Sequence, residues 1–217
     1  MEAADVNTPA DDGTPGRAGY RRSAGSPRGE ARRRELLDRV TDDLSVNGLV
    51  DFSLRRAARA AGTTHKVLLY HFDGVEDLLR QAIGRLRERR IGNALAATAG
   101  EASTRTLSAQ VRATWASLMA EEPGLRRVLD QAIGLAMYDP DRYTELGEEA
   151  SAQYLPVLTS FCPEHWSGRR KRAVAEMILA SLRGFLLERL IGGDVERVGV
   201  GVETLIRMLE REEAVDE

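Results

Sequence analysis

Apolar residues recur every three or four positions through most of the chain beyond residue 30, and this spacing constrains the fold more than any other feature. It places the apolar side chains on one face of an α-helix, whereas a half-buried β-strand alternates apolar and polar residues. No strand pattern interrupts the series, and turn signals that mostly contain Gly or Pro separate the periodic segments. The sequence therefore predicts an all-α fold.

Three closely spaced helices are predicted in the N-terminal part. The first spans residues 30–47, and the second begins after Ser53, a good N-cap residue, and closes at Gly62. The third follows Thr64 and spans residues 65–72. Gly62 supplies the left-handed backbone conformation that a tight turn between helices favours. A short helix, a glycine turn and a second short helix form the arrangement of a helix-turn-helix, whose second helix lies in the major groove of DNA.

Charges are unevenly distributed along the chain. The formal net charge of −3 would by itself argue against a polyanionic partner. Residues 1–15 hold four acidic residues and no basic one, residues 16–72 hold twelve Lys or Arg against six Asp or Glu, and residues 73–217 hold nineteen against twenty-four, so the balances are −4, +6 and −5. A basic segment beside an acidic body is typical of a nucleic-acid-binding module attached to a larger domain.

The helix-turn-helix segment also resembles a known family. The stretch SLRRAARAAGTT at residues 53–64, with LLYHF at 68–72 and EDLL at 76–79, is similar to the DNA-binding domain of the TetR family of transcriptional regulators. The resemblance covers roughly residues 30–80, and its most specific part is the spacing between Ala61–Gly62 and the LLYHF segment.

This resemblance implies an N-terminal three-helix helix-turn-helix DNA-binding domain and a C-terminal helical domain for ligand binding and dimerisation. We divide the chain into a disordered basic arm (residues 1–28), the DNA-binding domain (29–75) and the effector-binding and dimerisation domain (76–217). Arginines of the arm could follow a DNA groove, although such a run is more often a solvated tail. The expected protein is a homodimeric transcriptional regulator, and we favour a repressor that a small-molecule effector releases from its double-stranded DNA operator.

Residues expected to contact DNA lie around the turn and on the second helix of the motif. Thr63 and Thr64 stand at a helix N-terminus, which suits a phosphate group, although ordinary N-capping explains them equally well. Lys66 can donate to guanine, and Val67 can contact a thymine methyl group. By analogy with the family, Tyr70 faces DNA. His71 either faces DNA or forms a hydrogen bond with the backbone. The full set is Ser53, Arg55, Thr63, Thr64, His65, Lys66, Val67, Tyr70 and His71.

Two positions depart from the family pattern. Members often carry Tyr where this chain has Leu69, and a Lys that contacts a backbone phosphate where it has Val75. Arg55, Lys66 and Tyr70 remain available for phosphate contacts. The two departures favour an alternative hypothesis, in which the chain is an all-helical small-molecule-binding protein or enzyme with a vestigial helix-turn-helix.

Six further helices are predicted beyond residue 75. The first, from residue 78 to about 97, connects the DNA-binding module to the rest; in the family such a helix transmits ligand-driven motion. Pro156 should kink or split the fourth, because a proline removes a backbone donor within the helix. The last two are apolar over more than one face, which indicates a dimer interface, with monomer core as the other interpretation. The remaining ranges are 108–120, 125–137, 141–161, 169–191 and 198–212.

Large or adaptable side chains are frequent on the middle helices, where we expect an effector pocket. Aromatic residues at helical spacing are more often plain core, so each candidate also has that interpretation. The candidates are Trp115, Met119, Met137, Tyr138, Tyr154, Phe161, Trp166, Met177 and Phe185.

Several kinds of chemistry are disfavoured. Cys162 is the single cysteine, and His65, His71 and His165 have no spacing typical of a zinc site, so we expect neither a metal ion nor another cofactor. No Gly-rich phosphate loop and no nucleophile paired with a histidine is recognisable, and we expect no enzymatic activity. Short apolar runs and an acidic N-terminal segment predict a cytoplasmic protein without a membrane span or secretory signal.

Overall fold

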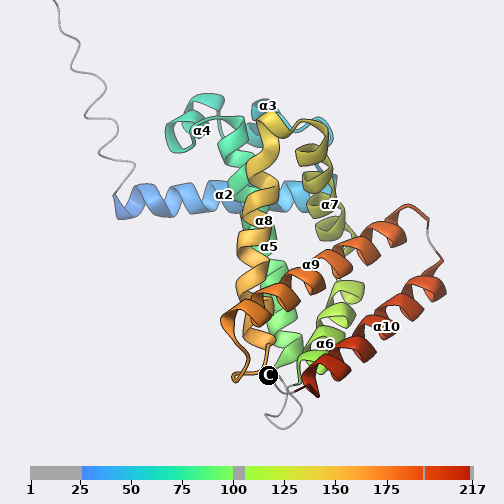
Figure 1. Cartoon of the computed structure of the whole chain (residues 1–217). Coiled ribbons are helices and arrows are strands. Elements are labelled where there is room, and N and C mark those ends of the chain that lie inside the picture. Colours follow the sequence, from blue (N-terminus) through green and yellow to red (C-terminus); the bar gives the residue numbers. More distant parts are fainter. Residues whose placement is uncertain (1–25, 100–105, 193, 216–217) are drawn as a thin grey trace, which may run out of the picture.

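The computed structural model describes residues 26–99, 106–192 and 194–215, and within these ranges it contains nine α-helices and no β-strand (Figure 1). The all-α prediction is confirmed. The helices are α2 (Pro27–Asn47), α3 (Leu54–Ala60), α4 (His65–His71), α5 (Val75–Thr98), α6 (Leu107–Ala120), α7 (Pro123–Tyr138), α8 (Pro140–Phe161), α9 (Gly168–Leu190) and α10 (Val195–Glu213).

Helix α2 begins earlier than the sequence pattern indicated. The Ser26 hydroxyl accepts a hydrogen bond from the Gly29 amide at 3.1 Å, and Pro27 occupies the first helical position, where its missing N–H is not needed. The last residues assigned to the basic arm are therefore helical. The rest of that predicted arm, residues 1–25, lies outside the described residues.

The turn between α3 and α4 is built as the sequence predicts. Gly62 has a φ of +61°, in the region that favours glycine, and the amide of Thr63 donates back to the Ala58 carbonyl at 2.9 Å. Ser53 and Thr64 cap the two helices with their hydroxyl groups, at 3.3 Å and 3.4 Å from the amides they accept from.

One apolar core joins the N-terminal helices to the helices that follow. It includes Leu36 of α2, Leu68 of α4, Ile83 of α5 and Val128 of α7, each without exposed surface. Figure 1 shows α5 and α8 running side by side below α3 and α4, with α2 crossing them. The predicted boundary at residue 75 therefore falls within one continuous core.

A second core lies at the opposite end, between α6, α8, α9 and α10, and includes Val111, Ile178 and Leu209. Helix α8 runs unbroken from Pro140 to Phe161, so of the two expected outcomes, a kink or a split at Pro156, the split does not occur. Pro156 removes one backbone hydrogen-bond donor from the helix. The burial of Leu158 and Phe161 in this core, on the same helix, offsets that loss. None of the helices in the described ranges combines the length and apolar character needed to cross a bilayer.

Candidate functional site

Helix α4 exposes its first turn. Thr64, His65 and Lys66 are exposed, and so is Arg55 on the preceding helix. These side chains, with the half-buried Thr63, surround the glycine turn, and Figure 1 shows α4 at the outer end of the molecule, away from α9 and α10. Within the described ranges, no other helix covers this end of α4 (Figure 1).

The later residues of α4 are only partly accessible. Val67 packs against the first core, and the ring of Tyr70 meets the ring of His71 edge-on, with centroids 4.8 Å apart. The His71 carbonyl accepts a hydrogen bond from the Arg33 Nε at 3.1 Å. Burial lowers the pKa of the His71 imidazole, and repulsion from Arg33 and Arg32 lowers it further.

Not every arginine near the turn is available to a ligand. The Arg56 guanidinium pairs with Asp43 at 2.7 Å and donates to the Val50 and Gly48 carbonyls, both at 2.8 Å. Arg56 thus fastens the segment before α3, whereas no such contact holds the neighbouring exposed Arg55 within the described part of the chain.

The two departures from the family pattern occupy different environments. Leu69 is 53% exposed on α4, beside the half-buried Tyr70. Val75 is half-buried as the first residue of α5. An apolar side chain at these positions cannot donate a hydrogen bond to a phosphate, unlike a basic or hydroxyl side chain.

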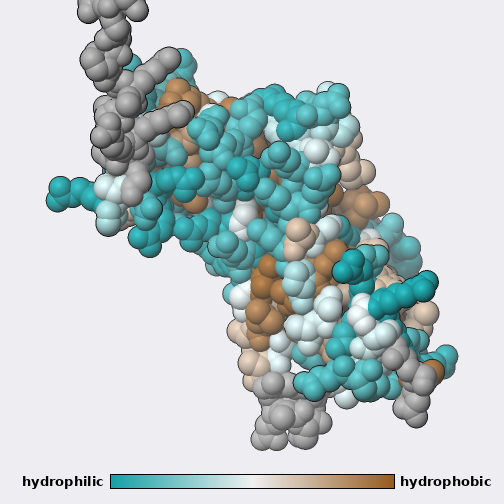
Figure 2. Space-filling view, turned by 60° about the vertical axis from the view of Figure 1, so that its left-hand side comes forward, coloured by the Kyte–Doolittle hydropathy of each residue, from teal (hydrophilic) through white to brown (hydrophobic). Residues whose placement is uncertain are grey.

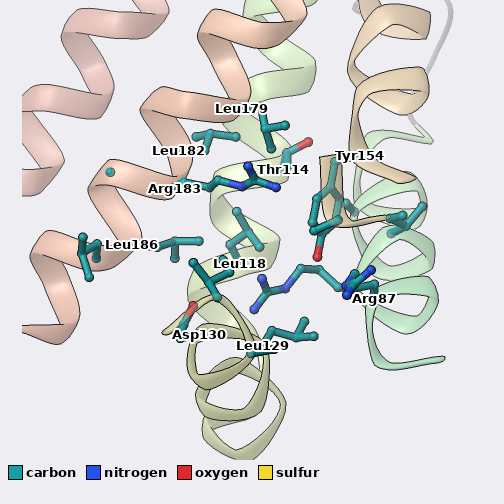
Figure 3. Close-up of a pocket in the computed structure, with 18 of the residues that line it drawn as sticks. Arg87, Thr114, Leu118, Leu129, Asp130, Tyr154, Leu179, Leu182, Arg183 and Leu186 are labelled. Atoms are coloured by element: carbon teal, nitrogen blue, oxygen red, sulfur yellow. The ribbon is translucent and has the colours of Figure 1, made fainter. Parts of the chain in front are cut away.

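A cavity of about 300 Å³ lies between α5, α6, α7, α8 and α9 (Figure 3). Its size is at the lower end of the range for small-molecule sites. Figure 2 shows that the face over the N-terminal helices is mostly hydrophilic, while hydrophobic residues gather lower down, at the level of the C-terminal helices. The cavity wall is mainly aliphatic, with Leu118, Leu129, Leu158, Leu182 and Leu186 among its lining residues.

Three of the predicted pocket residues line this cavity: Met137, Tyr154 and Phe161. The other six do not. Trp115 and Phe185 pack edge-on against each other at 6.1 Å, and Arg170 stacks over the Trp166 ring at 4.0 Å. The three that remain are the half-buried Met119, the exposed Met177 and Tyr138, which is 88% exposed.

Charged residues that sequence reasoning missed also line the cavity: Arg87, Arg90, Asp130 and Arg183, together with the hydroxyl residue Thr114. One signal was available. Arg87 and Arg90 continue the buried face of α5 between Leu86 and Ala94, and both are almost fully buried. A charged residue on the apolar face of a helix is rarely buried without a function or a partner.

Two of these arginines are held by protein partners. Arg90 forms a bidentate pair with Glu121, with contacts of 2.8 and 2.5 Å, and both residues are buried. Arg87 donates to the Leu146 carbonyl at 2.9 Å and lies 3.6 Å from the Glu149 carboxylate. These contacts satisfy the charges that the wall would otherwise bury alone.

Asp130 and Arg183 are less well satisfied. The buried Oδ2 of Asp130 and the buried Nε of Arg183 have no hydrogen-bond partner among the described residues. Burial raises the pKa of the Asp130 carboxyl, and burial lowers the pKa of the Arg183 guanidinium. Burial likewise raises the pKa of the Tyr154 phenol, against the attraction of Arg90. Ordinary protein cores leave few such atoms unpaired.

Apolar side chains remain exposed on α9, on α10 and between them. On α9 these are Met177, Leu187, which is 55% exposed, and Leu190, and the two leucines also line the cavity. Beyond them lie exposed Ile191, Val195, Val200 and Met208. The described ranges contain no group of His, Cys, Asp and Glu residues arranged to hold a metal ion.

No protein-family model matches the sequence, and no curated protein matches it. Solved structures do match the fold. A TetR transcription regulator from Haloarcula marismortui aligns with a TM-score of 0.61 and 16% identity, over 84% of this chain and 98% of that chain. A transcriptional regulator from Rhodococcus sp. Rha1 aligns with a TM-score of 0.62 and 16% identity, over 85% of this chain and 99% of that chain.

A third structure contains a ligand. It is the multidrug binding protein EbrR complexed with imidazole, which aligns with a TM-score of 0.62 and 18% identity, over 84% of this chain and 90% of that chain. Each of these matches covers more than four-fifths of this chain. The chain therefore has the fold of the TetR-family transcriptional regulators.

Proposed function

We propose that this protein is a sequence-specific DNA-binding transcriptional regulator, acting as a homodimer and released from its operator by a small molecule. The observation that carries the proposal is the exposed first turn of α4, with Thr64, His65 and Lys66, set on the same core as the helices that enclose the cavity. A shared core of this kind supports coupling between a DNA-reading helix and a ligand site.

Proposed DNA contacts follow from exposure and chemistry. Lys66 is exposed on the first turn, where its ammonium can reach a guanine edge. The exposed Arg55 on α3 is positioned for a phosphate of the DNA backbone. Ser53, Thr63, Thr64, His65, Val67, Tyr70 and His71 complete the proposed surface, the last three from partly buried positions that leave only part of each side chain available.

Ligand control is supported by the cavity. It has the volume of a small-molecule site and is enclosed by helices α5 and α7, which also contribute to the core around α4. The structurally similar EbrR has been crystallised with imidazole and with proflavin, so this fold accommodates small molecules. A ligand that separates α5 from α7 would move α4 with them.

Dimerisation is supported by the exposed apolar residues of α9 and α10. Side chains such as Leu190, Ile191 and Val200 lie on surface that water would cover in a monomer. A two-fold dimer would present two copies of α4 to successive major grooves, which lie roughly 34–36 Å apart along DNA. If the ligand changes that spacing, the dimer no longer fits its operator and repression is relieved.

The proposal is tested by incubating purified protein with fragmented genomic DNA and sequencing the retained fragments. We expect a small set of fragments that share a pseudo-palindromic sequence. Retention of fragments without a common sequence, combined with tight binding of a small molecule, would instead favour the alternative of a small-molecule-binding protein with a vestigial helix-turn-helix.

A further inference from the structure

We infer that the cavity takes a small, largely apolar carboxylate, whose carboxylate group accepts hydrogen bonds from the Arg183 guanidinium while its hydrocarbon part lies against the leucines of the wall. This inference rests on the proposed function, in which the cavity is the effector site, and it specifies the chemical class of the effector.

Arg183 is placed inside the cavity rather than at its edge. Figure 3 shows its side chain projecting from α9 toward Tyr154 of α8, with Thr114 of α6 nearby. Its Nη1 donates to the Ser151 hydroxyl at a long 3.3 Å, and its Nε has no hydrogen-bond partner among the described residues. A guanidinium has five donors in a planar fork that matches a carboxylate.

No carboxylate of the described part of the chain forms an ion pair with Arg183. Arg87 carries a charge of the same sign as Arg183: burial lowers the pKa of the Arg87 guanidinium, and repulsion from Arg183 lowers it further. A half-buried cation without an anion is unfavourable in a low-dielectric wall, and an incoming anion removes that cost.

Two other charged residues of the cavity wall have an anionic neighbour. Arg90 is paired with the buried Glu121, and Arg87 lies beside Glu149. Asp130 carries an unpaired oxygen, but the positive charges of Arg90 and Arg126 both act on it. No carboxylate among the described residues acts on Arg183 in a comparable way, so its positive charge is the less compensated of the two and favours an anionic ligand over a cationic one.

The remaining surface limits the rest of the ligand. Leu179, Leu182 and Leu186 flank Arg183 on α9, and Leu118 and Leu129 lie across from them on α6 and α7 (Figure 3). A volume of about 300 Å³ holds a medium-length alkyl chain or a small aromatic ring system with one polar end. Burial of that apolar part supplies affinity, and Arg183 supplies orientation.

Isothermal titration calorimetry with full-length protein and three probes of equal chain length tests the inference: decanoate, decanol and decylammonium, each kept below its micellar concentration. We expect decanoate to bind roughly ten- to a hundredfold more tightly than either of the other probes. One charge-assisted hydrogen-bonded pair contributes a binding free energy of this size. Equal affinity for decanol, tightest binding of decylammonium, or no binding of any probe would overturn the inference.

Variants locate the headgroup. Arg183→Met should remove the preference for decanoate while leaving decanol affinity unchanged, and Arg183→Lys should keep part of the preference because the charge remains. Arg172→Met is the matched control, since Arg172 lies exposed on the same helix and does not line the cavity. An unchanged decanoate preference in Arg183→Met and in Arg183→Gln would contradict the inference. Calorimetry uses no DNA, so its failure is distinct from a failure of the genomic selection.

Discussion

The guanidinium of Arg80 lies 2.9 Å from the carboxylate of Glu149, so that an ion pair joins α5 to α8. The second oxygen of Glu149 lies 3.6 Å from Arg87, which lines the cavity. Glu149 therefore connects a residue of the cavity wall to Arg80, a residue closer to the start of α5. The carboxylate holds two arginines of α5 from the neighbouring helix.

The same network extends to α4. Arg80 pairs with Asp77 at 2.7 Å, and Asp77 accepts from the Gln81 amide at 2.8 Å. Gln81 in turn accepts from Arg33 at 2.6 Å, and Arg33 donates to the carbonyl of His71, the last residue of α4, at 3.1 Å. A continuous series of polar contacts thus links the cavity wall to the end of the proposed DNA-reading helix.

Glu149→Gln should weaken the link between ligand and DNA. A neutral amide cannot hold both arginines, so the ligand-induced loss of DNA affinity should shrink by about fivefold or more. DNA affinity is measured with and without decanoate in each variant. Glu145→Gln is the control, because Glu145 is 72% exposed and lies 3.6 Å from Arg80. If both variants respond to ligand as the native protein does, this network does not carry the signal.

Gly124→Ala should destabilise the fold. A Cβ atom at Gly124, near the start of α7, would lie 1.9 Å from the backbone carbonyl oxygen of Ser45 on α2, so the two helices would have to separate. Overpacking of this kind costs about 1–3 kcal/mol, measurable by urea unfolding. Gly92→Ala on α5 meets no atom within 4 Å and should be neutral or more stable by up to ~1 kcal/mol. Equal stabilities of the two variants would show that α2 and α7 separate without cost.

Glu121→Gln should be strongly destabilising, because it leaves the buried Arg90 without its anion. Breaking one partner of a buried pair costs about 3–5 kcal/mol, whereas replacing both by apolar residues can be nearly neutral. The free energy of unfolding is compared for Glu121→Gln and for the double variant Arg90→Met, Glu121→Leu. A single variant as stable as the native protein would mean that water reaches Arg90.

His71 should make folding stability depend on pH. Its folded-state pKa is lowered from 6.5, first by burial and then by Arg33 and Arg32. The unfolded chain therefore takes up the proton at a higher pH than the folded protein does. The stability contributed by the neutral imidazole is fully present above 6.5 and is lost as the pH falls through the lowered folded-state pKa. The free energy of unfolding, measured with urea at about pH 7.5 and about pH 5.5, should differ less between the two pH values in His71→Gln than in the native protein. If the difference is the same in both proteins, the pH dependence comes from other titratable groups.

Local signals made the N-terminal helices predictable. Ser53 and Thr64 cap their helices as expected, and Gly62 has a positive φ, because each effect depends only on neighbouring backbone groups. The predicted ranges 125–137 and 141–161 begin after Pro123 and Pro140, yet both prolines occupy the first turns of α7 and α8, where a proline is tolerated. Boundaries were therefore less predictable than the helices themselves.

The cavity was less predictable because it depends on which helix faces meet. Residue type suggested Trp115 and Phe185, yet they pack against each other beside α10, and α9 directs Arg183 rather than Phe185 into the cavity. A periodic pattern shows that a face is apolar without showing which neighbour covers it. The sequence shows Arg183 only as a charged residue between Leu182 and Leu186, and does not indicate that its side chain faces a cavity.

The affinity for a DNA fragment recovered by the genomic selection, relative to a scrambled duplex of equal length at fixed salt, tests the central claim most directly. We predict that the native protein prefers the recovered fragment by roughly a thousandfold or more, and that Lys66→Ala reduces this preference by about 1–3 kcal/mol while Arg55→Ala weakens binding to both duplexes alike. Equal affinity of the native protein for the two duplexes would contradict the account.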